Sequence, residues 1–217
     1  MALPEGLEFM ALAVLDGGTY YHHEAIHGDR YRHLFDRVIY IRELTAQSVA
    51  DVDTLIVADR INSNLLRQHA GTLIDFLQAG HTLVVLGENE AHTWAPNVRW
   101  SSRPTNFWWW LEKGARPPHQ LVHPNHELFR YVPFENTIWH FHGVLTVPEG
   151  AETLIAVPPD PEGRDNGGAL LYDDRVTTRG RLIVSTLDPF YHHGSNFMPA
   201  TTRFLDGFLV WARETRK

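Results

Sequence analysis

A strand, a long helix and a second strand follow one another with short links in the first half of the chain. Thr54–Val57 (TLIV) and His81–Leu86 (HTLVVL) are short apolar runs typical of buried strands. Between them, apolar residues at helical spacing predict a helix over Asn62–Ala79, with Asn62 or Ser63 as its N-cap. Because such a unit joins parallel strands through a right-handed crossover, the chain is expected to form an α/β sheet.

Further apolar runs extend this sheet on both sides of the unit. Phe9–Leu15 (FMALAVL) is expected to be a central strand, and Pro199–Arg213 an amphipathic closing helix. Ala91–Pro118 is expected to be an irregular, Trp-rich insertion outside the core. Other predicted strands are Arg37–Leu44, Thr137–Val147, Thr153–Val157, Gly168–Asp174 and Arg181–Asp188. The sequence therefore predicts one α/β domain over residues 1–217, with helices on both faces of a mainly parallel central sheet.

Composition excludes several classes of function. The formal net charge is -7 and the Lys and Arg residues are scattered, which argues against nucleic acid because phosphate binding needs a clustered basic face. No apolar run approaches the roughly 20 residues that span a bilayer, and the start lacks a basic leader, so we expect no membrane segment and a cytoplasmic location. Because there is no cysteine, disulfides, thiolate zinc sites and a cysteine nucleophile are all excluded.

Three stretches carry a resemblance to a known family. They are AGHTLVVLGE at 79–88, HPNHELF through WHFHG at 123–143, and GRLIVSTLD at 180–188. In this order they resemble the class I glutamine amidotransferase-like superfamily, and within it the trehalose-utilisation (ThuA-like) group. The resemblance implies a flavodoxin-like three-layer sandwich.

The turn after the fourth strand departs from the amidotransferase pattern. Amidotransferases carry a cysteine there, whereas this chain reads Leu86-Gly87-Glu88-Asn89-Glu90. Glutamine hydrolysis needs an acyl-forming nucleophile activated by a base, which a carboxylate cannot replace in the same geometry. The resemblance therefore implies a fold without glutaminase activity, a departure that ThuA-like proteins generally share.

Polar residues gather where the predicted strands end. Ligands of open parallel sheets bind outside the carboxyl ends of the strands, and His140 and His142 share one face if their segment is extended. We therefore expect one crevice to be lined by Asp16, Arg60, Glu88, His140, Asp188 and His192, with Asn89, Trp94, His142 and His193 as further ligand-binding candidates.

Most of these residues also have a simpler structural interpretation. Asp16 precedes two glycines and is well placed for an Asx-turn. Glu88 is suited to the N-terminal charge of a following helix. Asp188 precedes a proline and is a good turn starter, and His192 and His193 are compatible with a solvated loop.

Three functions remain open from the sequence. The first is binding of a small polar, sugar-like ligand, with Trp94 or Trp108 as an apolar face for a sugar ring and with support from the family's association with sugar utilisation. The second is a metal-assisted hydrolase or isomerase with a divalent metal on His140, His142, Asp188 and His192. The third is a non-enzymatic interaction subunit that buries its Trp-rich insertion against a partner. A second copy of the chain, in a homo-oligomer, is one such partner.

If the chain catalyses a reaction, the strand-end carboxylates are the expected bases. Glu88 is the preferred general base and Asp188 the second choice, with His192 as acid partner or metal ligand and no acyl-enzyme intermediate. A carboxylate beside an imidazole in a partly dry crevice is expected to have its pKa moved toward neutrality, where proton transfer is most effective.

Overall fold

Five parallel strands form the centre of the molecule. The computed structural model describes residues 11–104, 107–163 and 165–214. The central strands run in the order β2 (Arg37–Tyr40), β1 (Leu12–Asp16), β3 (Thr54–Val57), β4 (Thr82–Leu86) and β10 (Arg181–Ser185). This order is that of flavodoxin-like sheets, and it confirms the predicted α/β fold with a parallel central sheet.

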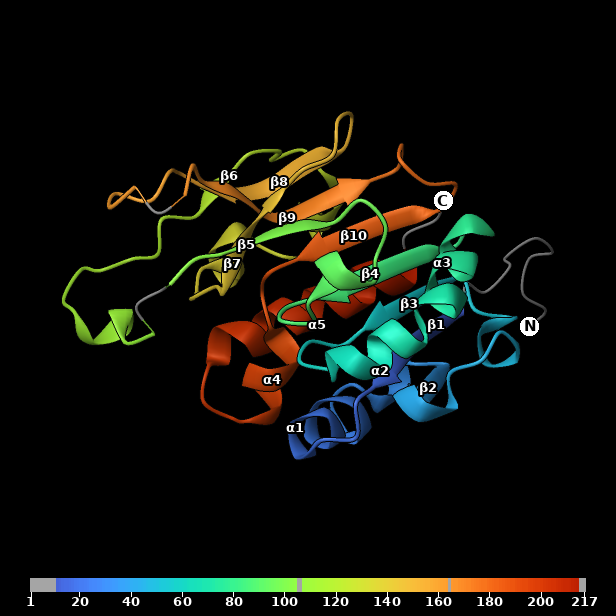
Figure 1. Cartoon of the computed structure of the whole chain (residues 1–217). Coiled ribbons are helices and arrows are strands. Elements are labelled where there is room, and N and C mark those ends of the chain that lie inside the picture. Colours follow the sequence, from blue (N-terminus) through green and yellow to red (C-terminus); the bar gives the residue numbers. More distant parts are fainter. Residues whose placement is uncertain (1–10, 105–106, 164, 215–217) are drawn as a thin grey trace.

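Antiparallel strands continue the sheet beyond β10, as Figure 1 shows. They are β9 (Gly168–Asp174), β8 (Glu152–Val157), β7 (Gly143–Thr146), β6 (Gln120–Leu121) and β5 (Arg99–Ser102). β5 pairs with β7, so the expectation that Ala91–Pro118 lies wholly outside the core is wrong. Three of the four β5 side chains are exposed. The apolar pattern that marks a buried strand is therefore missing there.

Two predicted strands are much shorter than expected, and a third, Arg181–Asp188, ends early at Ser185. β2 ends at Tyr40, and a 3-10 turn over Ile41–Glu43 follows it. In the run Thr137–Val147 only β7 is extended, because a 3-10 turn ends at Thr137 and irregular backbone carries residues 138–142. The spacing of apolar residues was the same as in a buried strand, so the sequence did not distinguish this buried loop from a strand. The first strand is confirmed from Leu12 onward, and Phe9 and Met10 of its prediction lie outside the described residues.

The predicted long helix is present as two consecutive helices. α2 (Ser63–Gln68) and α3 (Ala70–Gln78) meet at His69. The Asn62 side chain accepts hydrogen bonds from the backbone N–H groups of residues 64 and 65, which confirms it as the N-cap. Remaining helices are α1 (Tyr20–His22), α4 (Pro189–Gly194) and α5 (Pro199–Glu214), and short turns lie at His23–His27, Arg32–Leu34, Gln47–Val49, Ala91–Thr93, Trp109–Leu111, Glu127–Arg130 and Phe134–Thr137.

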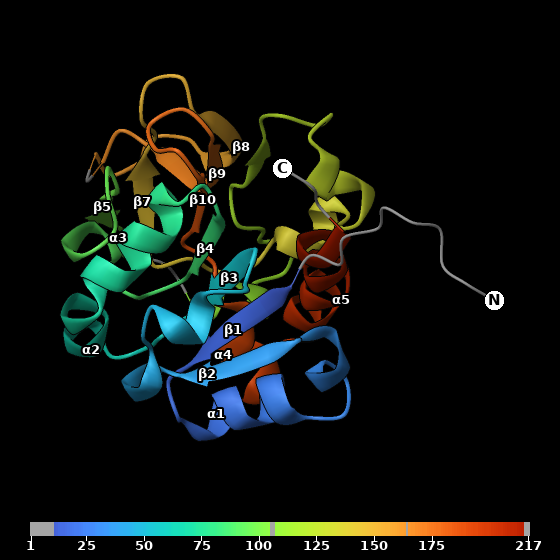
Figure 2. The ribbon, with the colours of Figure 1, turned by 90° about the vertical axis from the view of Figure 1, so that its right-hand side faces the viewer.

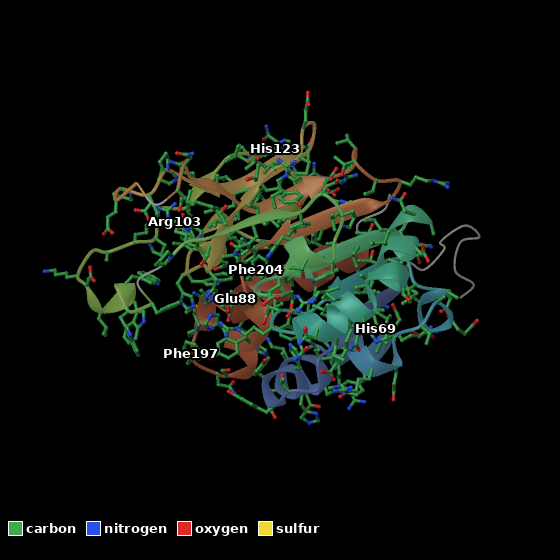
Figure 3. The ribbon with its side chains drawn as sticks, in the orientation of Figure 1. His69, Glu88, Arg103, His123, Phe197 and Phe204 are labelled. Carbon is green, nitrogen blue, oxygen red and sulfur yellow. The ribbon has the colours of Figure 1, made fainter. Side chains whose placement is uncertain are left out.

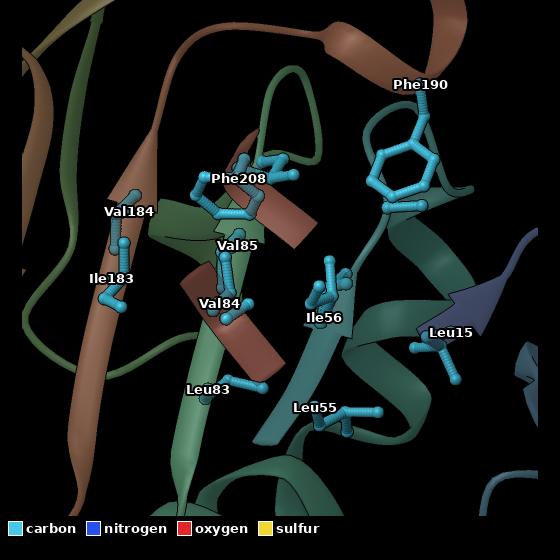
Figure 4. Close-up of a cluster of buried hydrophobic side chains, with 14 of the residues drawn as sticks. Leu15, Leu55, Ile56, Leu83, Val84, Val85, Ile183, Val184, Phe190 and Phe208 are labelled. Atoms are coloured by element: carbon cyan, nitrogen blue, oxygen red, sulfur yellow. The ribbon is translucent and has the colours of Figure 1, made fainter. Parts of the chain in front are cut away.

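Helices cover both faces of the central sheet. Figure 2 shows α2 and α3 on one side and α5 on the other. The core is apolar, and Figure 4 shows Leu55, Val84 and Ile183 on the strands together with Phe190 of α4 and Phe208 of α5. Among the described residues, no helix combines the length and the apolar character needed to cross a membrane.

Candidate functional site

The carboxyl ends of β3, β4 and β10 meet at a tight turn around Gly87. This glycine has a φ of 61°, and a Cβ atom placed on it would lie 2.5 Å from Cβ of Asp59 and 2.8 Å from Cβ of Asp188. A side chain at position 87 would collide with both neighbouring strand ends, so only glycine fits this turn. The close approach brings Glu88 beside the residues that follow β3 and β10.

Arg60 links the three strand ends electrostatically. Its Nε and Nη2 atoms donate to Oδ2 of the fully buried Asp188 at 3.0 and 2.8 Å, and Nη2 lies 3.3 Å from Oε2 of Glu88. The guanidinium also lies over the Tyr191 ring, 3.9 Å from its centroid. Arg60 has a φ of 60°, a left-handed conformation that costs energy in a residue with a side chain and that recurs at functional sites.

Asp59 fixes the start of α4. Its buried carboxylate accepts hydrogen bonds from the backbone N–H groups of Phe190 and Tyr191 at 2.7 and 2.9 Å. Burial and the charge of Asp188 raise the pKa of Asp59. By holding the first turn of α4, Asp59 positions His192 beside Asp188.

His142 stands between two carboxylates. Its Nδ1 lies 3.0 Å from Oε1 of Glu88 and its Nε2 lies 3.2 Å from Oδ2 of Asp188. Burial alone would lower the pKa of His142, but the hydrogen bonds with Asp188 and Glu88 outweigh it and raise the pKa to about 9. Burial lowers the pKa of the neighbouring His140 to about 4, so that imidazole is neutral at physiological pH.

The expected upward pKa shift of the strand-end carboxyls is wrong. The hydrogen bond from His142 lowers the pKa of Glu88 below its usual value. Burial would raise the pKa of Asp188, but the contacts of its carboxylate with His142 and His192 outweigh it, and the net pKa lies well below the usual range. The pairing of Arg60 with both carboxylates and the double contact of His142 together favour the ionised carboxylates.

Four potential metal ligands converge at this point. His140, His142, Asp188 and His192 each offer a ligand atom, and these atoms all lie within 4.8 Å of one another. The rings of His140 and His192 meet edge to face with centroids 4.5 Å apart. Nε2 of His192 lies 3.1 Å from Oδ1 of Asp188, but the two are not aligned as a hydrogen bond. These are the same four residues that were predicted from the sequence as candidate metal ligands.

A cavity of about 900 Å³ opens above this cluster. Its base is polar and includes Arg60, Glu88, His140, His142 and His192. Its walls are aromatic and include Phe107, Trp108, Trp110, Tyr191 and Phe197. Figure 3 shows Glu88 and Phe197 at the same end of the molecule. Hydrophobic walls with a few convergent polar groups are typical of small-molecule sites.

Two other predicted ligand-binding residues have structural roles. Asn89 is buried, donates to the carbonyls of residues 58 and 86, and accepts from the backbone N–H of residue 61. Trp94 is only 4% exposed and its Nε1 donates to the Asn89 carbonyl, so the expectation of an exposed aromatic platform at Trp94 is wrong. These hydrogen bonds stabilise the turn at Gly87, which precedes Asn89. The residue types of Asn89 and Trp94 alone did not indicate this structural role.

Asp16 and His193 lie outside the cavity lining. Asp16 accepts from the backbone N–H of Gly18 at 2.7 Å, the Asx-turn considered from the sequence, and its second oxygen lies 3.1 Å from Nε2 of His27. His193 points to the other side of α4, where Nδ1 lies 2.8 Å from Oγ1 of Thr202. Adjacent residues of a helix face different directions, so His192 and His193 do not share a site.

Sequence reasoning missed several residues of the site. Asp59 was not among the predicted site residues, because its capping of α4 depends on a contact 131 residues along the chain. Phe107 and Phe197 lie in irregular segments, where no periodicity marks a cavity wall. The Phe107 ring meets the edge of His140 with centroids 4.9 Å apart, which places the Trp-rich segment beside the polar cluster.

Comparisons with known proteins support the fold. No protein-family model matches the sequence, and no curated protein matches it significantly. Among solved structures, a cytoplasmic protein of Salmonella typhimurium LT2 has a TM-score of 0.57 at 13% identity, over 94% of this chain and 100% of that one. A protein from Bacteroides uniformis, provisionally described as ThuA-like, has a TM-score of 0.52 at 10% identity, over 98% of this chain and 97% of that one.

A third similar structure has a different description. It is a protein from Thermoplasma acidophilum, provisionally described as one of the subunits of GMP synthase, with a TM-score of 0.55 at 12% identity, over 95% of this chain and 97% of that one. At such identities the similarity concerns the fold alone. Together with the strand order, it supports a class I glutamine amidotransferase-like fold for this chain.

Proposed function

We propose that this chain binds a small polar, sugar-like ligand in the cavity above the carboxyl ends of β3, β4 and β10. The observation that carries the proposal is the combination of an aromatic wall with a charged base in one cavity of about 900 Å³. Sugars present both hydroxyl groups and flat apolar C–H faces, and a site of this composition matches both. The association of ThuA-like proteins with sugar utilisation adds support.

The two parts of the cavity have different roles in the proposal. Trp108 lines the cavity and is 64% exposed, and in the proposal its ring presents an apolar face to the sugar. At the base, the Glu88 carboxylate is 41% exposed and accepts hydrogen bonds from ligand hydroxyls, while Arg60 and His142 hold it in place. Asp188 is fully buried behind these groups and acts through them.

The proposal excludes hydrolysis of glutamine through an acyl-enzyme. The turn that carries the amidotransferase cysteine holds Glu88 in this chain, and the sequence contains no cysteine. The Glu88 carboxylate is paired with His142 and Arg60, and an ionised carboxylate in such pairs is not an acyl-forming nucleophile for an amide.

Thermal-shift measurements with a panel of neutral sugars, polyols and sugar acids test the proposal. A ligand at 100 times its Kd stabilises the folded state by about 2.7 kcal/mol, which gives a measurable rise in Tm. We expect at least one compound to raise the Tm of the wild-type protein, and Trp108→Ala to weaken that response. Tyr20→Ala is the matched control, because Tyr20 is 66% exposed and lies outside the cavity lining. If no compound raised the Tm, or if Trp108→Ala responded as the wild type does, the proposal would be wrong.

A further inference from the structure

We propose that His140, His142, Asp188 and His192 form a binding site for one divalent transition-metal ion of the zinc class at the base of the cavity. The inference goes beyond the binding of a sugar-like ligand, and it stands whichever ligand the aromatic walls receive. Each of the four residues offers a ligand atom, and these atoms lie within 4.8 Å of one another.

Buried polar atoms at the centre of the cluster have no hydrogen-bond partner among the described residues. They are both ring nitrogens of His192, Nδ1 of His140 and Oδ1 of Asp188. These side chains are nearly or fully buried, with His192 at 1% exposure and His140 at 4%. Buried polar groups are nearly always paired because leaving them unpaired is costly. A metal ion satisfies several of them at once.

The spacing of the central atoms suits direct coordination. Nε2 of His192 and Oδ1 of Asp188 are 3.1 Å apart without hydrogen-bond alignment. Two ligands on one tetrahedral zinc ion, with bonds of about 2.0 to 2.1 Å, are separated by about 3.3 Å. A small adjustment of the cluster is therefore enough to accommodate an ion.

The outer contacts have the arrangement found around metal ligands. Nδ1 of His142 lies 3.0 Å from Oε1 of Glu88, and Nε2 on the other side of the ring lies 3.2 Å from Oδ2 of Asp188 and 3.2 Å from Nη2 of Arg60. Metal-bound histidines commonly donate their second ring N–H to a carboxylate in this way. Arg60 binds Oδ2 of Asp188, and Oδ1 is left for the ion.

A metal-free ion-pair network accounts for fewer of these contacts. In that arrangement a protonated His142 bridges Glu88 and Asp188, and Arg60 neutralises the remaining charge. It gives no hydrogen-bond partner to Nδ1 of His192 or to Nδ1 of His140, and Nε2 of His192 has only the unaligned contact of 3.1 Å with Oδ1 of Asp188. The convergence of these two imidazoles therefore favours the metal site.

A second group of potential ligands in the structure provides a contrast. His126, Glu152 and Asp173 also lie close together. Both oxygens of Asp173 accept hydrogen bonds from Arg181, and Nε2 of His126 lies 3.1 Å from Oδ2 of Asp173. Those ligand atoms already have partners, so that group carries no such inference.

The donor set and its exposure indicate the class of metal. Three imidazoles and one carboxylate suit zinc, manganese, iron or nickel, whereas magnesium and calcium prefer oxygen ligands alone. The three histidines line the cavity and Asp188 lies behind them, so the ion would face the cavity. A ligand hydroxyl or a water molecule has access to it from that side.

Elemental analysis of the full chain, purified without a histidine tag, tests the inference. The protein is stripped with EDTA, equilibrated with zinc or manganese chloride, dialysed, and analysed by mass spectrometry for metal per chain. We expect about one ion per wild-type chain. His192→Asn and His140→Gln each remove an imidazole and are expected to reduce the metal content at least tenfold. His126→Gln, in the contrasting group, is expected to retain it.

Thermal unfolding separates loss of the metal from loss of the fold. Each stripped variant is expected to unfold cooperatively, and the metal is expected to raise the Tm of the wild type and of His126→Gln but not of the two site variants. Substoichiometric metal in the folded wild type, or undiminished metal in both folded site variants, would refute the site. A sugar response without metal binding would refute this inference alone, and metal binding without a sugar response would refute the proposed function alone.

Discussion

Glu88 follows the glycine turn after β4, and its charged neighbours determine its state. The hydrogen bond from His142 lowers the pKa of Glu88, and Arg60 lies 3.3 Å from its second oxygen. An ionised carboxylate in this position accepts hydrogen bonds and orients His142. At the residue scale, the site is organised for binding and positioning.

Glu88→Gln tests this positioning role. The substitution keeps the shape of the side chain but removes the charge that orients His142. Loss of such an outer contact typically weakens metal affinity by about 10-fold to 100-fold, and competition with a chelator measures the change. Glu90→Gln is the control, because Glu90 is exposed and pairs with Arg67. Equal affinity in the two variants would show that the Glu88 contact does not support a metal ligand.

At the scale of elements, the site depends on how closely three strand ends approach one another. The turn after β4 passes between Asp59, which follows β3, and Asp188, which follows β10, and Gly87 is the residue that allows this approach. Asp59 in turn holds the first turn of α4 and thereby His192. The cluster is therefore a product of packing between elements that are far apart in sequence.

Gly87→Ala is expected to destabilise the protein more than Gly114→Ala. Both glycines have a positive φ, 61° and 80°, so each substitution costs about 1 to 2 kcal/mol through the backbone. Only at position 87 would the new Cβ collide with neighbouring atoms, whereas position 114 has no atom within 4 Å among the described residues. Overpacking adds about 1 to 3 kcal/mol. Urea unfolding measures the free energy of unfolding of both variants. Equal losses of stability in Gly87→Ala and Gly114→Ala would contradict the close packing around Gly87.

The elements differ in how far the sequence predicted them. β3, β4 and β9 match their apolar runs because they are buried along nearly their whole length. β5 was missed because its side chains are mostly exposed, and residues 138–142 form a buried loop whose composition resembles a strand. The polar strand ends indicated where Arg60, Glu88 and Asp188 meet. Trp108 of the aromatic wall was a candidate from the sequence, whereas Phe107 and Phe197 were not, because they reach the cavity from irregular segments.

At the scale of the whole molecule, the two ends of β10 belong to two different groups of charged residues. Asp188 follows the carboxyl end and belongs to the site, whereas Arg181 at the amino end belongs to an ion network with Asp173 and Glu127. The Asp173 side chain is 1% exposed. This second network stabilises the sheet at a distance from the cavity.

Asp173 is expected to make the protein sensitive to acid. Burial would raise the pKa of Asp173, but His126 and Arg181 outweigh it and the net pKa lies well below the usual value. A depressed folded-state pKa contributes stability above the unfolded pKa of about 3.9, and this stability is lost as the pH falls below that value. Urea unfolding at pH 6, 4 and 3 should therefore show a difference in the free energy of unfolding between wild type and Asp173→Asn, and this difference should become smaller toward pH 3. Glu149→Gln, an exposed carboxylate, is the control, and a gap that stayed constant with pH would contradict this account.

The central claim is that the aromatic-walled cavity is the binding site of the molecule. A crystal structure of the chain with the compound that raises its Tm most tests this claim directly. We predict electron density for that compound between Trp108 and His140, with its hydroxyl groups within hydrogen-bond distance of Glu88. Density confined to the adjoining cavity, at Arg30, Asn196 and Asp206, or an unchanged aromatic cavity in crystals grown at saturating ligand, would contradict it.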